Sequence, residues 1–147
     1  MRVVRLEKKR LFKIMSKADA GDIAVIAKDL KDKHSVVVIK APNKTLAMIK
    51  MREPVKKSLF YIGEVMVTEI ILELDGIKGM AVTMGDDFDK VYDMAVIDAA
   101  CNSGIFEREQ ELLLLEAEQK EVEMKENAMY MKTMVNFNSM DSEAPKV

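Results

Sequence analysis

The sequence predicts an α+β protein with about four mostly antiparallel strands, helices packed on one face of the sheet and a long C-terminal helix. Three observations support this fold class. Segments that are rich in β-branched residues, or that alternate between apolar and polar positions, occupy the middle of the chain between residues 36 and 84. Segments with helical periodicity flank them on both sides. A dense, charged helical run then extends from residue 107 to about residue 135.

The composition is that of one globular domain. The chain has 147 residues, of which 49% are hydrophobic and 33% charged, and its net charge is −2. So small a charge provides no long-range attraction for nucleic acid or an anionic membrane. No stretch approaches the run of about 20 apolar residues that spans a bilayer, and the basic N-terminus lacks the pattern of a signal peptide. We therefore expect a cytoplasmic protein that binds neither nucleic acid nor membrane.

Cysteine and histidine are too scarce for most metal and redox sites. The single cysteine, Cys101, excludes an internal disulfide and a cysteine-held cluster. The single histidine, His34, argues against a histidine metal site or a histidine-based triad unless a partner completes it. We expect no metal site in this chain. The 13 methionines suit both core filling and subunit surfaces, because their flexible side chains adapt to irregular neighbours.

Two helices are expected before the first strand. Residues 5–15 place apolar side chains among lysine and arginine, which predicts a short amphipathic helix with a basic, solvated face. Residues 18–22 interrupt this pattern. Asp19 or Asp22 then caps a second helix, whose apolar positions extend to residue 30.

A first pair of strands is predicted between the second helix and Pro54. Residues 36–39 form a β-branched run, and residues 45–52 alternate well enough for a second strand. The intervening residues 41–44, which include Pro42, read as the turn of a hairpin. Pro54 ends the second strand, because proline cannot donate to a strand ladder.

A second pair of strands forms the centre of the predicted sheet. Residues 65–74 alternate, the dipeptide Asp75-Gly76 signals a tight turn, and the apolar run 80–84 is the natural antiparallel partner. One face of the first of these strands is apolar and the other carries acids: Met66, Thr68, Ile70, Leu72 and Leu74 against Glu69 and Glu73.

Two further helices complete the chain. Residues 88–102 carry a wide apolar stripe, and Gly104 is placed as a C-terminal cap. The run 107–135 is either two helices joined by a kink or an arm that docks on another subunit, and the sequence favours neither. We divide the chain into a core domain of residues 1–104, a partner-docking helical arm of residues 105–141 and a frayed tail of residues 142–147.

Acidic residues are the main candidates for chemistry. Carboxylates such as Glu64 and Glu69 that converge in space can perform acid–base work or hold Mg²⁺ for a triphosphate, although a solvated sheet face is the simpler interpretation. Asp86 and Asp87 follow Gly85 at a strand-to-helix junction, where helix capping is the simpler interpretation. Asp98 lies inside an apolar helix, where a charge is costly unless it is paired. It is either a buried polar anchor or a partner contact.

Several motifs in order resemble the G subunit of the carbon–phosphorus lyase core complex. They are Gly63-Glu64-Val65-Met66-Val67-Thr68-Glu69, Gly79 followed by an apolar strand into Gly85-Asp86-Asp87, Ala95-Val96-Ile97-Asp98-Ala99-Ala100, and the ending Thr133-Met134-Val135-Asn136-Phe137-Asn138-Ser139-Met140. The resemblance extends from about residue 10 to residue 141. Asp86 departs from it, because some members of that family carry a basic residue at this position.

The resemblance implies an accessory subunit in the catabolism of organic phosphonates. The assembly converts ATP and a phosphonate into alpha-D-ribose 1-methylphosphonate 5-triphosphate and releases adenine. This chain is then a transferase subunit that binds no cofactor alone, with ATP and its Mg²⁺ as a substrate of the complex. The I subunit is the first expected partner, with H and J as others.

The same resemblance suggests which residues matter. Glu64, Thr68, Glu69, Asp86 and Asp87 are the candidates near substrate, and Asp98, Met131, Val135, Phe137 and Met140 are the candidates for partner contact. One alternative is a helical adaptor with no link to phosphonate. Another, weaker alternative is an enzyme that acts alone.

Overall fold

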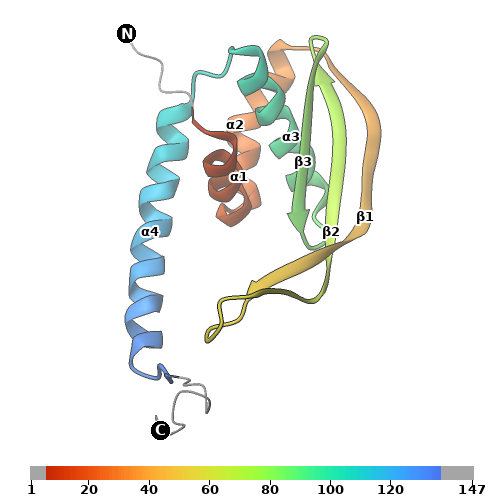
Figure 1. Cartoon of the computed structure of the whole chain (residues 1–147). Helices are drawn as coiled ribbons and strands as arrows, with labels where there is room; N and C mark the ends of the chain where they lie inside the picture. The colour runs from red at the N-terminus through yellow and green to blue at the C-terminus, as the bar shows by residue number, and fades with distance from the viewer. Residues whose placement is uncertain (1–5, 137–147) are drawn as a thin grey trace, which may run out of the picture.

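The computed structural model describes residues 6–136 and confirms the α+β class. Three strands form one antiparallel sheet in the order β1-β2-β3, and four helices accompany it (Figure 1). The elements in chain order are α1 (Lys8–Lys17), α2 (Ala20–Lys33), β1 (Val36–Arg52), β2 (Leu59–Leu74), β3 (Ile77–Met84), α3 (Phe88–Ser103) and α4 (Glu109–Met131).

The predicted count of about four strands is wrong, because the first predicted pair is a single long strand. β1 runs through Pro42, where a turn was expected, and pairs with β2 on both sides of it. The ladder shifts register between Lys40 and Asn43, which absorbs the extra residues as a bulge. β1 is an edge strand with β2 as its one neighbour. Proline has no N–H to donate, and it is tolerated where no neighbouring strand requires that hydrogen bond.

The turn that joins β1 to β2 lies instead at residues 53–58. It is closed by two backbone hydrogen bonds, from the Glu53 N–H to the Ser58 carbonyl and from the Lys57 N–H to the Glu53 carbonyl. β1 and β2 therefore extend beyond the end of β3, where the last paired residues are Met84 of β3 and Val67 of β2. We call the two-stranded extension, residues 46–66 with its connecting turn, the β1–β2 ribbon. In Figure 1 the ribbon swings below the helical layer toward α4.

The core lies between the sheet and the helices on one of its faces. The predicted inward face of β2 is confirmed for Thr68, Ile70, Leu72 and Leu74, which are all fully buried. Met66 lies in the ribbon and is 43% exposed, because the helical layer does not extend that far. α3 packs on this face, and its residues from Asp93 to Ala100 are all buried.

Local chemistry sets the turns and helix ends as predicted in most places. Asp75 and Gly76 both adopt positive φ, 49° and 82°, as a two-residue hairpin turn requires. The Asp87 side chain accepts a hydrogen bond from the Lys90 N–H at 3.0 Å and so caps α3, and Gly104 ends α3 in the left-handed conformation. Asp19 occupies the N-cap of α2 without a side-chain capping bond.

α4 is one helix, so the alternative of two kinked helices is wrong. Its 23 residues extend about 35 Å at 1.5 Å per residue, and it ends at Met131, earlier than the predicted residue 135. Figure 1 shows α4 beside α1, with its C-terminal half extending beyond the end of α1.

The contact between β3 and α3 leaves no room at Gly79. A Cβ atom added there would press on the Ala95 carbonyl oxygen and lie only 2.6 Å from the Ala99 Cβ atom. The sheet and helix therefore approach closely because this position has no side chain.

Gly79→Ala should lower the free energy of unfolding by about 1–3 kcal/mol, because the added methyl forces α3 away from the sheet. Urea unfolding followed by circular dichroism measures the change. Gly63→Ala is the matched control, since a Cβ atom added there would meet nothing within 4 Å and no loss is expected. Equal stability of the two variants would contradict the close packing.

Candidate functional site

The five predicted substrate-proximal residues do not converge on one point. Thr68 faces the helices and donates a hydrogen bond to the Gly85 carbonyl at 2.7 Å. Glu69 points to the opposite face of the sheet and pairs with Lys40. Asp87 is engaged in capping α3. Their first roles are therefore structural.

Among these five residues, Asp86 and Glu64 have exposed side chains that make few or no polar contacts within the described residues. Asp86 follows Gly85 and lies 3.8 Å from Lys44, a loose ion pair at the surface. Glu64 is exposed on the ribbon opposite Met48 and makes no ion pair within the described residues. The backbone bond from the Gly85 N–H to the Met66 carbonyl brings the Asp86 loop beside the base of the ribbon.

Asp98 is a buried polar anchor. Its side chain is 1% exposed and accepts a hydrogen bond from the Met80 N–H at 3.1 Å. Asn102, one turn further along α3, donates to the Lys78 carbonyl at 2.9 Å. Two side chains of α3 thus satisfy backbone groups of β3 that no other strand reaches. The second carboxylate oxygen of Asp98 lies 3.4 Å from Lys8 Nζ and accepts no hydrogen bond.

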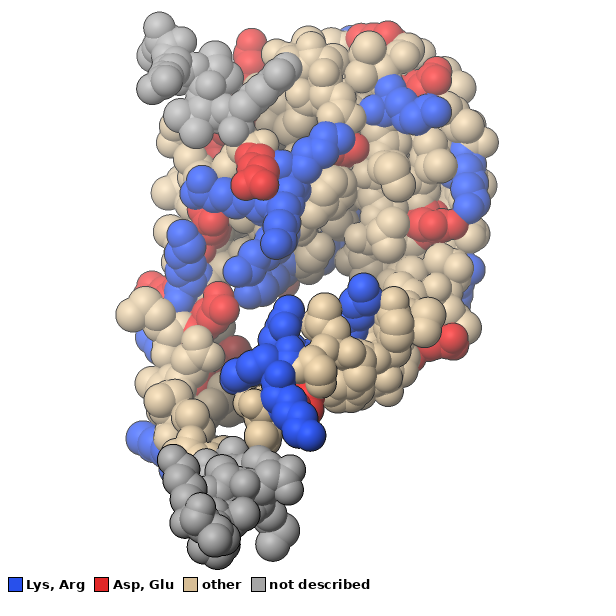
Figure 2. Space-filling view, in the orientation of Figure 1, with Lys and Arg blue, Asp and Glu red and all other residues tan. Residues whose placement is uncertain are grey.

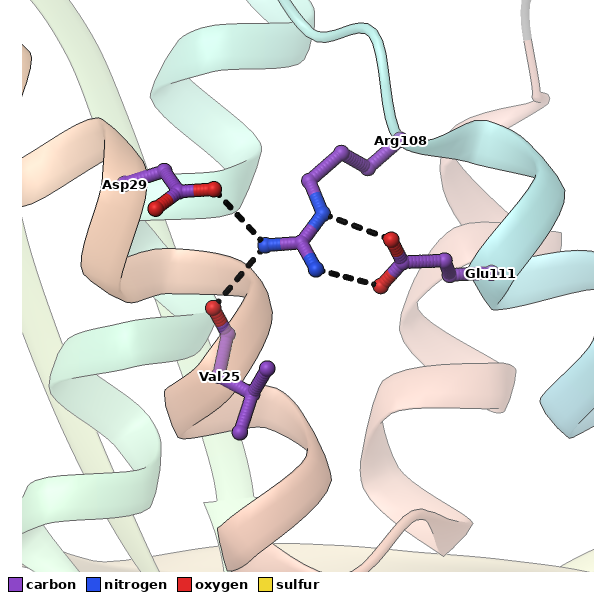
Figure 3. Close-up of polar contacts among 4 residues, drawn as sticks. All are labelled: Val25, Asp29, Arg108 and Glu111. Atoms are coloured by element: carbon purple, nitrogen blue, oxygen red, sulfur yellow. Dashed lines mark hydrogen bonds and ion pairs between the residues drawn. The ribbon is translucent and has the colours of Figure 1, made fainter.

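Polar contacts attach the first half of α4 to the body. Figure 3 shows Arg108, just before α4, forked onto Glu111 with two 2.8 Å bonds and reaching the Val25 carbonyl and Asp29 of α2. Further along, Arg10 of α1 makes a bidentate pair with Glu116 at 2.9 and 2.5 Å.

The attachment of α4 to α1 ends about two-thirds of the way along the helix. Gln119 donates to the Ile14 carbonyl at 2.9 Å, and Lys17 pairs with Glu123 at 3.5 Å. Beyond Glu123, no described side chain of α4 contacts α1 through a hydrogen bond or ion pair. The part of the helix beyond Glu123, which we call the projecting end of α4, therefore has no polar support from the body.

Large apolar side chains are exposed in several places, including Val37, Ile39, Met80, Val82 and Met84 of the sheet, and many of them lie on two extensions of the body. On the ribbon these are Leu46, Met48, Ile49, Met51, Val55, Leu59, Phe60, Tyr61, Ile62 and Met66. On and after the projecting end of α4 they are Met124, Met129, Tyr130, Met131, Met134 and Val135. Large exposed apolar patches mark surfaces that bind another macromolecule.

The predicted interface candidates fall partly in this second region. Met131 and Val135 are each 66% exposed. Phe137 and Met140 lie outside the described residues.

A basic hollow separates the ribbon from the helical body. Figure 2 shows lysine and arginine side chains gathered on both sides of it, over α1 and near the tip of the ribbon. The basic residues of these two elements are Lys8, Lys9, Arg10, Lys13 and Lys17 in α1, and Arg52, Lys56 and Lys57 at the tip. A surface of this sign favours acidic groups on whatever occupies the hollow.

Hydrogen bonds lower the pKa of three carboxyl groups. Arg10 holds the pKa of Glu116 below its ordinary value, and Lys40 does the same for Glu69. The Ser35 backbone N–H, followed by His34, lowers the pKa of Asp75. All three groups favour the ionised state in the fold. None of these shifts creates a carboxyl that remains protonated near neutral pH and could serve as a general acid.

His34 and the acids are not arranged as a catalytic or metal centre. His34 Nδ1 lies 2.5 Å from Asp75 Oδ2, at the junction between α2 and the β2–β3 turn. Within residues 6–136, no three acidic, histidine or cysteine side chains group closely enough to hold a metal ion. No helix in that same range is both long and apolar enough to cross a membrane.

The described residues form a small α+β body that carries two apolar extensions and no converging set of catalytic groups. The chain belongs to the family of the phosphonate metabolism protein PhnG, whose family model matches residues 6–141. Its role is in phosphonate metabolism, as a component of the carbon–phosphorus lyase. None of the curated proteins compared with the chain matches it.

Sequence reasoning missed the ribbon as a functional feature. The turn assigned at Pro42 concealed the length of β1, and β2 was predicted to begin at residue 65 rather than Leu59. The apolar run Leu59-Phe60-Tyr61-Ile62 was the available signal, because four consecutive apolar residues fit a strand with two apolar faces. The Arg10–Glu116 and Arg108–Asp29 pairs left no pattern in the sequence, because their partners lie far apart in the chain.

The Arg10–Glu116 contact predicts an acid-sensitive contribution to stability. Because its pKa is lowered in the fold from an ordinary 4.5, Glu116 stabilises the fold above that value, and the contribution is lost as pH falls through the folded-state pKa. Glu116→Gln should therefore be less stable than the wild type near pH 7, and the difference should shrink below about pH 4.

Chemical denaturation between pH 7 and pH 3 measures this difference. Glu118→Gln, two residues away and without an ion pair among the described residues, is the control and should show no such pH dependence. A Glu116→Gln effect that stays constant with pH would mean that the ionised pair contributes nothing.

Proposed function

We propose that this chain is an accessory subunit of the carbon–phosphorus lyase system. In this role it takes part in forming alpha-D-ribose 1-methylphosphonate 5-triphosphate from ATP and a phosphonate, with release of adenine, in the cytoplasm. The transferase chemistry belongs to the complex, and the chain is inactive by itself. The alternative of an adaptor unrelated to phosphonate is incompatible with membership of the PhnG family.

One observation carries this proposal beyond family membership: the chain exposes more apolar surface than its body covers. Every large apolar side chain in the projecting end of α4 is about two-thirds exposed or more, from 66% at Tyr130 and Met131 to 72% at Met124. Burying a single side chain of this size contributes about 1.5–3 kcal/mol, so a partner that covers several gains substantial affinity. An enzyme complete in one chain has no need of such a surface.

The I subunit is the partner we assign to the helical arm. Met131 and Val135 would contact it, together with the predicted Phe137 and Met140 that follow in the sequence. The H and J subunits would occupy other surfaces of the same assembly. In this arrangement the division of the chain into a core and a docking arm has a direct purpose, since the arm extends past the body.

The contribution near substrate centres on Glu64 and the Asp86 loop. Glu64 is free of internal ion pairs among the described residues, whereas Thr68 and Asp87 hold the Gly85–Asp87 turn in place and Glu69 is paired with Lys40. Carboxylates that face solvent at the base of the ribbon can bind the Mg²⁺ of an ATP substrate once a partner supplies further ligands. This chain alone holds no cofactor in the proposed mechanism.

The docking role predicts that the tagged chain purifies with the I subunit when the two are produced together. Deleting residues 121–147 should abolish this association, and Met131→Asp should weaken it, because both remove apolar contact. Deleting only residues 142–147 is the control and should change nothing. An I subunit that copurifies equally with all four chains would exclude the arm as the docking element.

The substrate role predicts that Glu64→Gln lowers the rate of adenine release by the reconstituted complex from ATP and methylphosphonate, by about tenfold or more. Glu73→Gln, the same change on the outer face of β2, serves as the control and should retain the rate. The isolated chain should release no adenine. Unchanged turnover in Glu64→Gln would remove this residue from the site.

A further inference from the structure

β3 offers a free strand edge. It pairs with β2 alone, and the Gly85 N–H reaches back to the Met66 carbonyl of β2, so the odd-numbered residues face that strand. Because backbone groups alternate along a strand, the even-numbered residues of β3 point their N–H and C=O groups to the open side. The side chains of α3 occupy the first of these, at Lys78 and Met80. Within residues 6–136, no contact outside the sheet reaches the corresponding groups of Val82.

The two outer strands of the sheet, β1 and β3, differ in how readily their free edges can pair with another strand. The outer edge of β1 carries Pro42, several register shifts and the cations Lys40, Lys44 and Lys50, all of which discourage another strand from pairing there. The edge of β3 from Met80 to Met84 has no proline, no charge and no register shift. Of the two outer strands, only β3 is thus suited to accept another strand.

A groove lies along this edge. It has a volume of about 310 Å³, and α1 forms the opposite wall. Its lining residues are Lys8, Phe12, Met80, Ala81, Val82 and Asp98. The groove is mostly apolar, which suits the alternate side chains of an extended peptide.

Asp98 presents an unsatisfied acceptor to the groove. One of its oxygens already accepts from the Met80 N–H on the β3 edge. The other oxygen, Oδ1, is buried and accepts no hydrogen bond, although Lys8 Nζ lies 3.4 Å away and balances the charge. Buried acceptors are nearly always hydrogen-bonded, so this oxygen has the capacity to accept a hydrogen bond from a donor that enters the groove. A neutral donor is sufficient, because Lys8 already supplies a positive charge.

Charge decides the kind of occupant. α1 contains no acidic residue, and among its cations only Lys8, Arg10 and Lys17 have an ion-pair partner within the described residues. A second copy of this chain that paired edge to edge would bring its own basic α1 against this one. An extended segment with acidic residues would instead complement the positive charge of α1, whose Lys8 lines the groove.

We propose that β3 accepts an extended, acidic and apolar segment of another subunit, which adds as a fourth strand along Met80–Met84 and donates a hydrogen bond to Asp98. The inference rests on the proposed function, because it requires that the chain works inside an assembly. It assigns a second docking surface, separate from the projecting end of α4.

The test uses the full chain reconstituted with the I, H and J subunits. Val82→Pro removes the edge-facing N–H without removing a bond to β2, and it should weaken assembly about tenfold relative to Val82→Ala, which keeps the N–H. In the wild-type complex, hydrogen exchange at the Val82 and Met84 amides should slow compared with the isolated chain. This second readout does not depend on the folding of the proline variant.

The contrary outcomes are distinct. Equal assembly of Val82→Pro and Val82→Ala, or unchanged exchange at these amides in the complex, overturns the inference and leaves the proposed function standing. Failure of the wild-type chain to assemble with any of the three subunits removes both. If the isolated chain protects these amides through self-association, or loses protection when shortened to residue 136, the occupant is a second copy or its own C-terminal segment, and the proposal is wrong.

Discussion

Close packing of α3 on the β2–β3 face fixes the positions of the other elements. Gly79 lets the backbone of β3 approach Ala95 and Ala99, and Asp98 and Asn102 then reach the free backbone groups of the strand. A helix so placed is covered on both sides, by the sheet and by α2, which explains why a run of eight residues in it is buried without exception, from Asp93 to Ala100. The buried carboxylate of Asp98 is tolerated in this run because it accepts a hydrogen bond from the Met80 N–H at the edge of β3.

The same arrangement limits how much of the sheet is covered. β3 has 8 residues, whereas β1 and β2 have 17 and 16, so the paired strands continue well past the helical layer. The ribbon they form is apolar on both faces, with nothing from the described chain packed against it. α4 also extends past the body: ion pairs hold it to α1 as far as Glu123, and only the residues after Glu123 lack such contacts within the described chain.

These features are those of a subunit of a larger complex. Its acids serve the fold first, as caps, ion pairs or the anchor at Asp98, and its apolar extensions remain available to neighbours. Membership of the PhnG family agrees with this physical picture, since the family belongs to a multisubunit lyase. In Figure 1 the ribbon turns toward the C-terminal part of α4, so these two exposed extensions lie at the same end of the molecule.

The fold class, the positions of the helices, the Asp75-Gly76 hairpin, the caps at Asp87 and Gly104, and the family could all be predicted from the sequence. Each of these depends on local periodicity, on the chemistry of a few adjacent residues or on an ordered set of motifs. Other features became visible only in the folded chain: β1 passes through Pro42, the ribbon lies uncovered, Asp98 serves the β3 edge, and Arg10 and Arg108 hold α4. These features depend on residues far apart in the chain. Whether a strand can continue through a proline depends on how its partner strand pairs with it. Which apolar side chains remain exposed depends on how far the neighbouring layer of helices extends.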